Sequence, residues 1–184
     1  MEKKRCFWVN LDSPIYVEYH DSEWGIPVHD DHKLYEMFLL ETFQAGLSWI
    51  TILKKREYFR EAFDSFDVVK VAGYRDEKVE ELLQNKLIIR NRNKINAAVK
   101  NAAIFIEIQK EFGSFSNYLW GFTSGQVIVN TGDEVPVKTE LSDQISKDLK
   151  KRGMSFVGSV TIYSYLQAVG IVNDHDKDCF CRCQ

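Results

Sequence analysis

Apolar side chains recur along much of the chain with the period of an α-helix. In residues 33–43, Leu34, Met37, Phe38 and Glu41 follow the i, i+3, i+4, i+7 spacing that places side chains on one helical face. The sequence therefore predicts a helix with a glutamate on its apolar stripe. A carboxylate in such surroundings must be paired, protonated or functional. Glu41 is thus a candidate for chemistry, with a paired core glutamate as the alternative.

The same period continues after an interruption at Ala45-Gly46. It resumes over residues 47–53 and predicts further helices at residues 54–63, 68–72, 77–84, 94–112, 115–120, 143–152 and 158–169. Some of these helices follow side chains whose oxygens can accept from the free amides of a first turn, namely Asp67, Asp76, Ser114 and Ser142. Residues 121–139 are expected to form an irregular loop, whose β-branched run at 127–129 favours a short strand.

These elements predict an all-α protein of about eight helices, folded as a single domain over residues 1–184. The chain has no apolar run as long as the ~18 residues that a transmembrane helix needs, so we expect no membrane partner. Its N-terminus is basic but lacks an apolar stretch and a small-residue cleavage site. That pattern argues against secretion and for a cytoplasmic protein.

Charge and aromatic content narrow the function classes. A net charge of −3 excludes nucleic-acid binding by bulk positive charge alone but leaves local basic faces open. The chain has 4 Trp, 8 Tyr and 12 Phe. The first 49 residues alone contain Trp8, Tyr16, Tyr19, Trp24 and Trp49. Such density is typical of an aromatic core, and it also fits a pocket that stacks on flat ligands.

Cysteines and histidines near both ends of the chain supply candidate metal ligands. His175 and Cys179 are spaced so that both side chains fall on one side of a helical turn or tight loop. With a second pair from the N-terminal region, the candidate set is Cys6, His20, His175 and Cys179. This is a zinc-type donor set with no open position, so the metal would be structural and would join the two ends of the chain. Cys181 and Cys183 offer alternative ligands, and free thiols with surface histidines are the alternative to a metal site.

The remaining candidates for chemistry cluster after Glu41. No nucleotide-binding loop, metalloprotease motif or nucleophile elbow occurs, so no catalytic cofactor is expected. Trp49 could stack on a flat base, Glu41 could prefer a cationic base, Gly46 would admit close backbone approach, and Leu47 could act as a wedge. Together these residues fit a protein that extrudes a nucleotide from a duplex.

A basic connection between two predicted helices is the candidate phosphate contact. It runs over residues 87–94 and contains Arg90, Asn91, Arg92 and Lys94. Free amides at the start of the following helix would also attract phosphate. The alternative is an ordinary solvated helix start.

Long motifs spread along the chain carry a family resemblance. They are Cys6-x-Trp8, Tyr16-x-x-Tyr19-His20-Asp21-x-Glu23-Trp24-Gly25-x-Pro27, Leu40-Glu41-x-x-Gln44-Ala45-Gly46-Leu47-Ser48-Trp49, Thr51-x-Leu53-Lys54-Lys55-Arg56, Lys151-Arg152-Gly153-x-x-Phe156-Val157-Gly158 and Asn173-Asp174-His175. They closely resemble the bacterial 3-methyladenine DNA glycosylase I family (the Tag family) of the helix-hairpin-helix glycosylase superfamily. The match runs nearly from end to end and is weakest in residues 121–140.

The resemblance implies a helix-hairpin-helix glycosylase fold with its substrate pocket between two helical lobes and a DNA-gripping hairpin near residues 88–94. The zinc ligands implied by the family are Cys6, His20, His175 and Cys179, which leaves the other cysteines spare. The implied base pocket consists of Glu41, Tyr19 and Trp49, with Trp8, Tyr16, Trp24 and Ser164 close by. The chain lacks the catalytic aspartate of other helix-hairpin-helix glycosylases, and its hairpin has Asn91 and Asn93 in place of glycine.

The implied activity is that of a monofunctional DNA glycosylase in base excision repair. It would flip N3-methyladenine out of alkylated double-stranded DNA and hydrolyse the N-glycosidic bond, releasing free 3-methyladenine and leaving an abasic site. The methylated base is already cationic, so no general acid is required. Glu41 is the catalytic candidate, and we expect it to act by selecting the cation.

The expected setting is a monomer in the bacterial cytoplasm, acting at the nucleoid. The alternative function is a non-catalytic, zinc-containing binder of alkylated DNA. A second alternative is a glycosylase for another lesion, such as 3-methylguanine.

Overall fold

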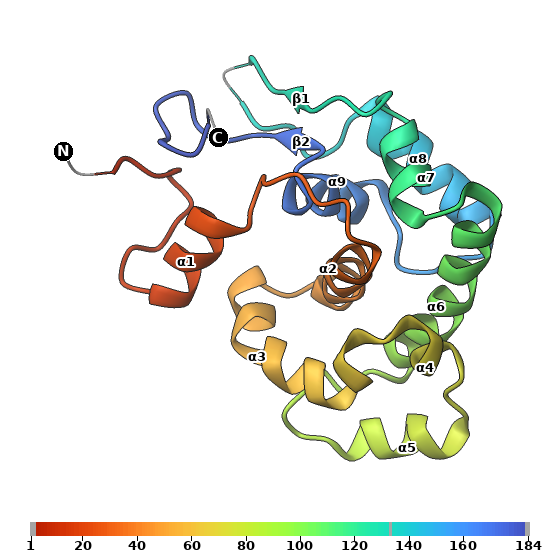
Figure 1. Ribbon diagram of the computed structural model, residues 1–184. Helices are drawn as coiled ribbons and strands as arrows, with labels where there is room; N and C mark the ends of the chain where they lie inside the picture. The colour runs from red at the N-terminus through yellow and green to blue at the C-terminus, as the bar shows by residue number, and fades with distance from the viewer. Residues whose placement is uncertain (1–2, 133, 183–184) are drawn as a thin grey trace.

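Helices form most of the molecule, which we describe from a computed structural model for residues 3–132 and 134–182. The helices are α1 (Pro14–Ser22), α2 (Asp31–Gln44), α3 (Trp49–Ala62), α4 (Val68–Ala72), α5 (Asp76–Gln84), α6 (Arg92–Phe112), α7 (Phe115–Gly121), α8 (Glu140–Lys151) and α9 (Ser159–Ala168) (Figure 1). A 3-10 helix, η1 (Asp64–Phe66), and two short strands, β1 (Ile128–Val129) and β2 (Val172–Asn173), complete the described elements.

Helix α2 lies at the centre of the fold, packed against α3, α6, α7 and α9 (Figure 1). Asp30 caps its N-terminus by accepting from the amide of Lys33 at 2.8 Å. Every side chain from Leu34 to Phe43 is buried, including Glu36 and Glu41. The predicted stripe is buried as expected, but the helix is not amphipathic over these residues, because neighbouring elements cover α2 on several sides.

The structure corrects several predicted helix boundaries. Residues 49–62 form one continuous helix, α3, where the sequence analysis divided the segment. Asp67 and Ser114 cap α4 and α7 as predicted, each by accepting backbone amides of the first turn. Thr139 caps α8 in place of Ser142, because the two side chains form a reciprocal capping box. The prediction came close in each region, since the capping side chains lie within one turn of the real ends.

Two helix starts differ from the sequence prediction. Asp76 is the first residue of α5, and Arg75 occupies the cap position without a side-chain bond. Helix α1 is absent from the sequence prediction, although Pro14 suits a first helical turn. Only Tyr19 and His20 of α1 are buried, so this short helix has no apolar stripe for the periodicity to reveal.

Strands β1 and β2 pair in parallel, with Ile128 opposite Val172 and Val129 opposite Asn173. The short strand favoured at residues 127–129 is therefore confirmed. The fold is mostly helical, as predicted, with this small two-stranded sheet beside the helices. The pair fastens the loop after α7 to the segment that leaves α9.

Residues 85–91 connect α5 to α6, and the two helices contact each other. Asn91 caps α6 by accepting from the amide of Lys94 at 3.2 Å. The helix ends at Gly113, whose φ of 83° is left-handed and favours glycine. At 21 residues, α6 is the longest described helix, yet neither it nor any other described helix is long and apolar enough to cross a membrane.

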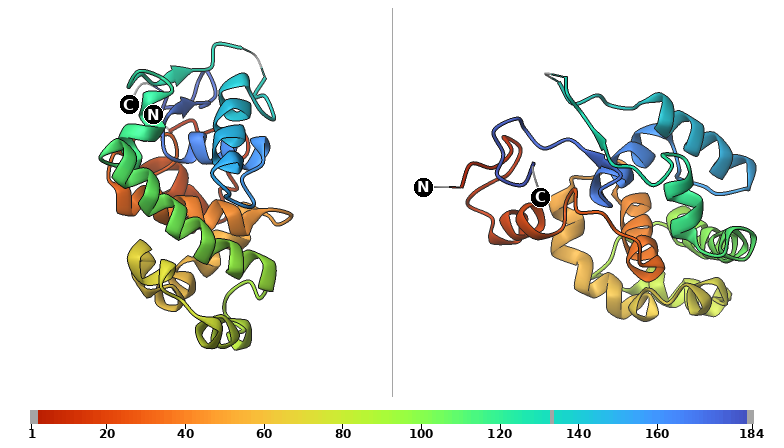
Figure 2. Two further views of the ribbon diagram at one scale, coloured as in Figure 1. Left: turned by 90° about the vertical axis from the view of Figure 1, so that its right-hand side faces the viewer. Right: turned by 45° about the horizontal axis from the view of Figure 1, so that its top comes forward.

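The two ends of the described chain lie side by side (Figure 2). The amide of Phe180 donates to the carbonyl of Lys4 at 2.9 Å, and the amide of Phe7 donates to Asp176 Oδ2 at 2.7 Å. Lys4 also forms an ion pair with Asp178. These contacts bring the N-terminal cysteine and the C-terminal Cys/His-rich segment into one region.

Candidate active site

A cavity of about 240 Å³ lies between the N-terminal segment, α1, the end of α2, the start of α3 and α9. It is smaller than the roughly 300–1,000 Å³ of drug-sized sites, which suits a ligand such as a single base. Its walls contain every residue assigned to the base pocket, namely Trp8, Tyr16, Tyr19, Trp24, Glu41, Trp49 and Ser164. The structure brings these residues together, and their contact with a base stays a prediction.

The cavity wall also contains residues that the sequence analysis missed, namely Phe7, Gln44, Val135 and Gln167. Phe7 and Val135 are exposed at 84% and 44%, so no burial pattern could reveal them. Gln167 stands one helical turn after Ser164 on α9, and that spacing was an available clue.

Aromatic rings hold one another in place along the wall. The ring centroid of Trp8 lies 5.3 Å from that of Tyr16 and 4.9 Å from that of Trp24. Tyr19 and Trp49 pack with centroids 5.4 Å apart. Tilted and edge-to-face pairs of this kind are favourable, so the cavity offers fixed ring surfaces for a flat ligand.

Glu41 carries an unpaired carboxylate in this wall. The residue is 4% exposed, and its Oε2 is buried without a hydrogen-bond partner among the described residues. By contrast, the nearby acids Glu23 and Glu36 both pair with Arg56. Burial raises the pKa of Glu41 to about 8. The alternative of an ion-paired core glutamate is excluded for the described part of the chain.

Trp49 adds an unpaired donor to the same cavity, since its Nε1 is buried with no partner among the described residues. Burial, and secondarily Glu41, raise the pKa of the Tyr19 phenol, which therefore remains a neutral hydroxyl. A buried donor or acceptor without a partner is costly. The cavity therefore suits a ligand that offers an acceptor to Trp49 Nε1 and a donor to Glu41 Oε2.

The turn between α2 and α3 presents an apolar side chain at the surface. Gly46 has a φ of 79°, which strains any L side chain, and no atom lies within 4 Å of the position its Cβ would take. Leu47 follows it and is 37% exposed. The turn therefore has the open backbone and apolar tip that a wedge requires.

Lys94 points inward, contrary to its assignment as a DNA contact. Its Nζ donates to the carbonyls of Phe43 and Ala45, each at 2.7 Å, at the end of α2. Those carbonyls have no partner in the helix itself, so the ammonium caps the helix C-terminus. Burial lowers the pKa of Lys94. The predicted phosphate contact is wrong for this residue, because its ammonium group reaches the C-terminal end of α2 and donates its hydrogen bonds to backbone carbonyls there.

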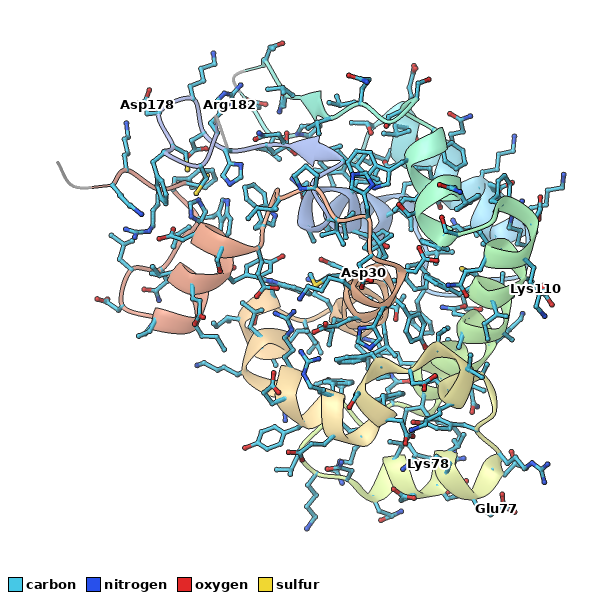
Figure 3. The ribbon with its side chains drawn as sticks, in the orientation of Figure 1. Asp30, Glu77, Lys78, Lys110, Asp178 and Arg182 are labelled. Atoms are coloured by element: carbon cyan, nitrogen blue, oxygen red, sulfur yellow. The ribbon has the colours of Figure 1, made fainter. Side chains whose placement is uncertain are left out.

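Lys94→Met is expected to destabilise the fold by about 2–3 kcal/mol, since it removes a charged donor and leaves buried carbonyls unpaired. Urea denaturation measures this change. Lys110→Met is the matched control, because Lys110 is exposed and extends away from α6 (Figure 3). A Lys94→Met protein as stable as the control would contradict the capping role.

The rest of the hairpin connection stays at the surface. Arg90 is exposed, and Arg92 pairs with Glu80 through a 2.9 Å hydrogen bond. Asn91 has a φ of −124° and serves as the cap of α6, so it does not substitute for a left-handed glycine. Among the predicted contacts here, Arg90, Asn91 and Arg92 remain candidates for phosphate binding.

Two histidines and two cysteines meet between the terminal segments. The ligand atoms of His20, His175, Cys179 and Cys181 all lie within 4.8 Å of one another, and all four residues are buried. Figure 3 shows sulfur atoms gathered at this junction, beside the C-terminal loop that carries Asp178 and Arg182. Two imidazoles and two thiols form a donor set that suits a structural metal ion.

Neighbouring polar groups orient both imidazoles toward the cluster. His20 Nδ1 lies 2.8 Å from Asp21 Oδ1, and His175 Nδ1 lies 2.9 Å from Asn173 Oδ1. Such partners hold a ligating histidine with its Nε2 toward the metal. His175 Nε2 is buried without a partner among the described residues, and His20 Nε2 lies 3.4 Å from Cys179 Sγ. The residues therefore fit a bound metal ion.

Cys181 stands in the cluster where the sequence analysis placed Cys6. Cys6 is buried beside it, with its amide 3.4 Å from His20 Nε2 and its Sγ accepting from the amide of Asp176 at 3.3 Å. Both thiols are free. The alternatives left open by the cysteine spacing thus persist in the structure, and Cys183 lies outside the described residues.

Comparison with known proteins identifies the family. The model of the methyladenine glycosylase family matches residues 8–182. The chain belongs to this family. It is 49% identical over 181 residues to DNA-3-methyladenine glycosylase 1 of Escherichia coli strain K12, covering 97% of this chain and 96% of that protein. It is 47% identical over 181 residues to DNA-3-methyladenine glycosylase of Haemophilus influenzae, covering 97% of each.

Solved structures of the family share the fold. The crystal structure of a 3-methyladenine DNA glycosylase I (TAG) has a TM-score of 0.93 at 48% identity, covering 97% of this chain and 99% of that chain. A structure of 3-methyladenine DNA glycosylase I (TAG) from Staphylococcus aureus, which describes how that enzyme recognises 3-methyladenine, has a TM-score of 0.91 at 36% identity. The match covers 96% of this chain and 95% of that chain. The resemblance to the Tag family is confirmed.

Proposed function

We propose that this chain excises 3-methyladenine from alkylated double-stranded DNA, as a monomer in base excision repair, and leaves an abasic site. The observation that carries the proposal is the buried, unpaired carboxylate of Glu41 in a cavity walled by aromatic rings. The family membership and the names of the two curated relatives support the same activity.

Base selection follows from charge. Methylation at N3 gives adenine in DNA a positive charge, whereas ordinary adenine is neutral. At about 4 Å and an effective dielectric near 20, a carboxylate attracts a unit positive charge by about 4 kcal/mol. The ionised form of Glu41 therefore favours the damaged base, while Trp49 and its neighbouring rings stack on either base.

Bond cleavage follows from the same charge. When the N-glycosidic bond breaks, the base leaves neutral and positive charge moves to the sugar, so no general acid is needed. The attraction to Glu41 then favours the bound lesion more than the transition state, and Glu41 acts in selection. No described residue of the cavity wall carries an amine, which favours attack by water over Schiff-base chemistry.

Duplex DNA would be held by the turn before α3 and by the hairpin before α6. Leu47 would fill the gap left by the extruded nucleotide, and Lys94 would keep that turn in place from within. Arg90 and the free amides at the start of α6 would contact phosphate.

Zinc is the metal that best suits the terminal cluster. His20, His175 and Cys179 would each supply a ligand, and Cys6 or Cys181 would supply the fourth. A four-coordinate site of protein ligands is structural, and its role here would be to fasten the N-terminal segment to the C-terminal segment.

Incubation with a methylated duplex tests the proposed function. We expect release of free 3-methyladenine and formation of abasic sites in that DNA and not in unmethylated DNA. Binding of methylated duplex without release would instead indicate the non-catalytic binder. Release of a different methylated base alone would indicate another lesion.

The pH profile gives a further test of Glu41. Because its pKa is raised to about 8, Glu41 is protonated in the empty cavity below that pH and lacks the charge that attracts the lesion. The affinity for a methylated duplex should therefore rise about tenfold per pH unit and level off near pH 8. The substrate's charge does not titrate in this range. Glu41→Gln should give a flat profile, and a flat profile for the wild type would contradict the assignment.

A further inference from the structure

Helix α9 contributes a second polar residue to the cavity besides Ser164. Gln167 lies one turn further along, is partly buried and lines the same cavity as Glu41. Its backbone carbonyl accepts from the amide of Gly25 at 3.1 Å, which fixes this part of the helix against the segment after α1. The position of Gln167 in the wall is therefore well defined.

Asp174 fixes the orientation of the Gln167 amide. Gln167 Nε2 donates to Asp174 Oδ2 at 2.6 Å, and the hydroxyl of Tyr163 donates to the same oxygen at 2.5 Å. Asp174 is 3% exposed, and its Oδ1 is buried without a partner among the described residues. A carboxylate oxygen accepts and does not donate, so the amide must direct its NH₂ group to Asp174. A flipped amide would set two acceptors against each other.

The carbonyl oxygen of the Gln167 amide has no hydrogen-bond partner among the described residues, while Nε2 is committed to Asp174. Gln167 Oε1 is therefore a free acceptor on α9, in a residue that lines the same cavity as the unpaired Glu41 Oε2 of α2. A ligand that carries an amino group can satisfy acceptors of this kind, whereas a ligand with a carbonyl in the same place cannot.

We propose that Gln167 is a specificity-determining residue that favours a 6-amino purine over a 6-oxo purine, and that Asp174 is the positioning residue that keeps its carbonyl turned to the cavity. The inference rests on the proposed function and names its substrate class more narrowly. Charge on Glu41 distinguishes methylated from ordinary bases, but it does not distinguish 3-methyladenine from 3-methylguanine, since both are cations in DNA. A fixed acceptor can make that second distinction, because it pairs with the amino group and is left unpaired, or repelled, by the oxo group.

The test is the ratio of 3-methyladenine to 3-methylguanine released from one methylated duplex. We expect Gln167→Leu to lower this ratio about tenfold, the loss expected from one hydrogen bond. Gln144→Leu, an exposed glutamine on α8, is the matched control and should keep the wild-type ratio. An unchanged ratio in Gln167→Leu would overturn the proposal. If the wild type releases no 3-methyladenine, the proposed function itself fails.

Asp174 is tested by exchanging donor and acceptor. Asp174→Asn should lower the ratio, because an asparagine amide can accommodate either orientation of Gln167. Adding Gln167→Glu to Asp174→Asn should restore the ratio, since the introduced amide can then donate to one oxygen of the introduced carboxylate and leave the other as an acceptor. A merely structural role would lower the release of both bases together and would not be rescued. Failure of the double variant to recover the ratio, with its folding confirmed by circular dichroism, would overturn the role of Asp174.

Discussion

Replacing Glu41 with glutamine is expected to weaken the affinity of the protein for 3-methyladenine in duplex DNA by about 100-fold or more. Glutamine keeps the size and the acceptor oxygen but removes the charge that attracts the cationic base. The rate of release from a saturated complex should not fall, because the charge leaves the base as the bond breaks and the attraction is not needed in the transition state. Single-turnover release at varied enzyme concentration separates these two effects.

The matched control is Glu107→Gln, which removes an exposed carboxylate from α6. This variant should leave both the affinity for the lesion and the rate of base release unchanged. Capture of the lesion by Glu41→Gln that equals that of the wild type would mean that the cavity selects by shape alone.

The same variant should be more stable than the wild type at neutral and alkaline pH. The pKa of Glu41 is raised from 4.5 to about 8 in the folded protein, so the folded state retains a proton that the unfolded state has lost. Folding stability therefore falls as pH rises through this window, by about 1.4 kcal/mol per pH unit. Glutamine does not titrate and avoids the loss. Urea denaturation of both proteins at pH 5 and pH 8 measures the difference, which should be larger at the higher pH.

Removal of the proposed zinc ion is the second change with a large expected effect. His20 and Cys179 are 159 residues apart, so a shared ion would restrict nearly the whole chain. We expect the purified protein to contain zinc. A strong chelator should lower stability by about 5 kcal/mol, or about 10–20 °C in Tm. Limited proteolysis should then cut the N-terminal segment first, while α2 and α6 stay protected.

Cysteine variants identify the fourth ligand in the same experiment. Cys6→Ser and Cys181→Ser each remove one thiol. The substitution that lowers the zinc content more identifies the cysteine that is the fourth ligand. Activity should also fall on metal loss, because Trp8 packs on His20 with ring centroids 5.3 Å apart and lines the base cavity. A metal-free protein with unchanged Tm and protease pattern would exclude a structural metal.

Local patterns predicted most helices well because they depend on neighbours within one or two turns. Asp67 and Ser114 cap their helices through amides two or three residues ahead, which spacing alone can reveal. Helix α1 could not be predicted from periodicity, because only two of its residues, Tyr19 and His20, are buried and two residues do not form an apolar stripe. The Thr139 cap of α8 could not be predicted, because Thr139 and Ser142 can both cap a helix that starts here, and only the backbone geometry shows which one does.

The sequence by itself determined the helical class, the family and the aromatic and acidic residues of the cavity wall, since long motifs and helical spacing are local properties of the chain. Only the tertiary structure decided what those side chains do. The sequence predicts Lys94 as a phosphate contact, yet its Nζ donates to the carbonyl of Phe43, 51 residues away. The orientation of the Gln167 amide depends on Asp174, which contacts it only in the folded protein. Glu41 needed a partner or a function, and the packing around α2 left its Oε2 without a partner in the described chain. Burial and pairing depend on contacts between distant segments, and spacing along the sequence does not contain them.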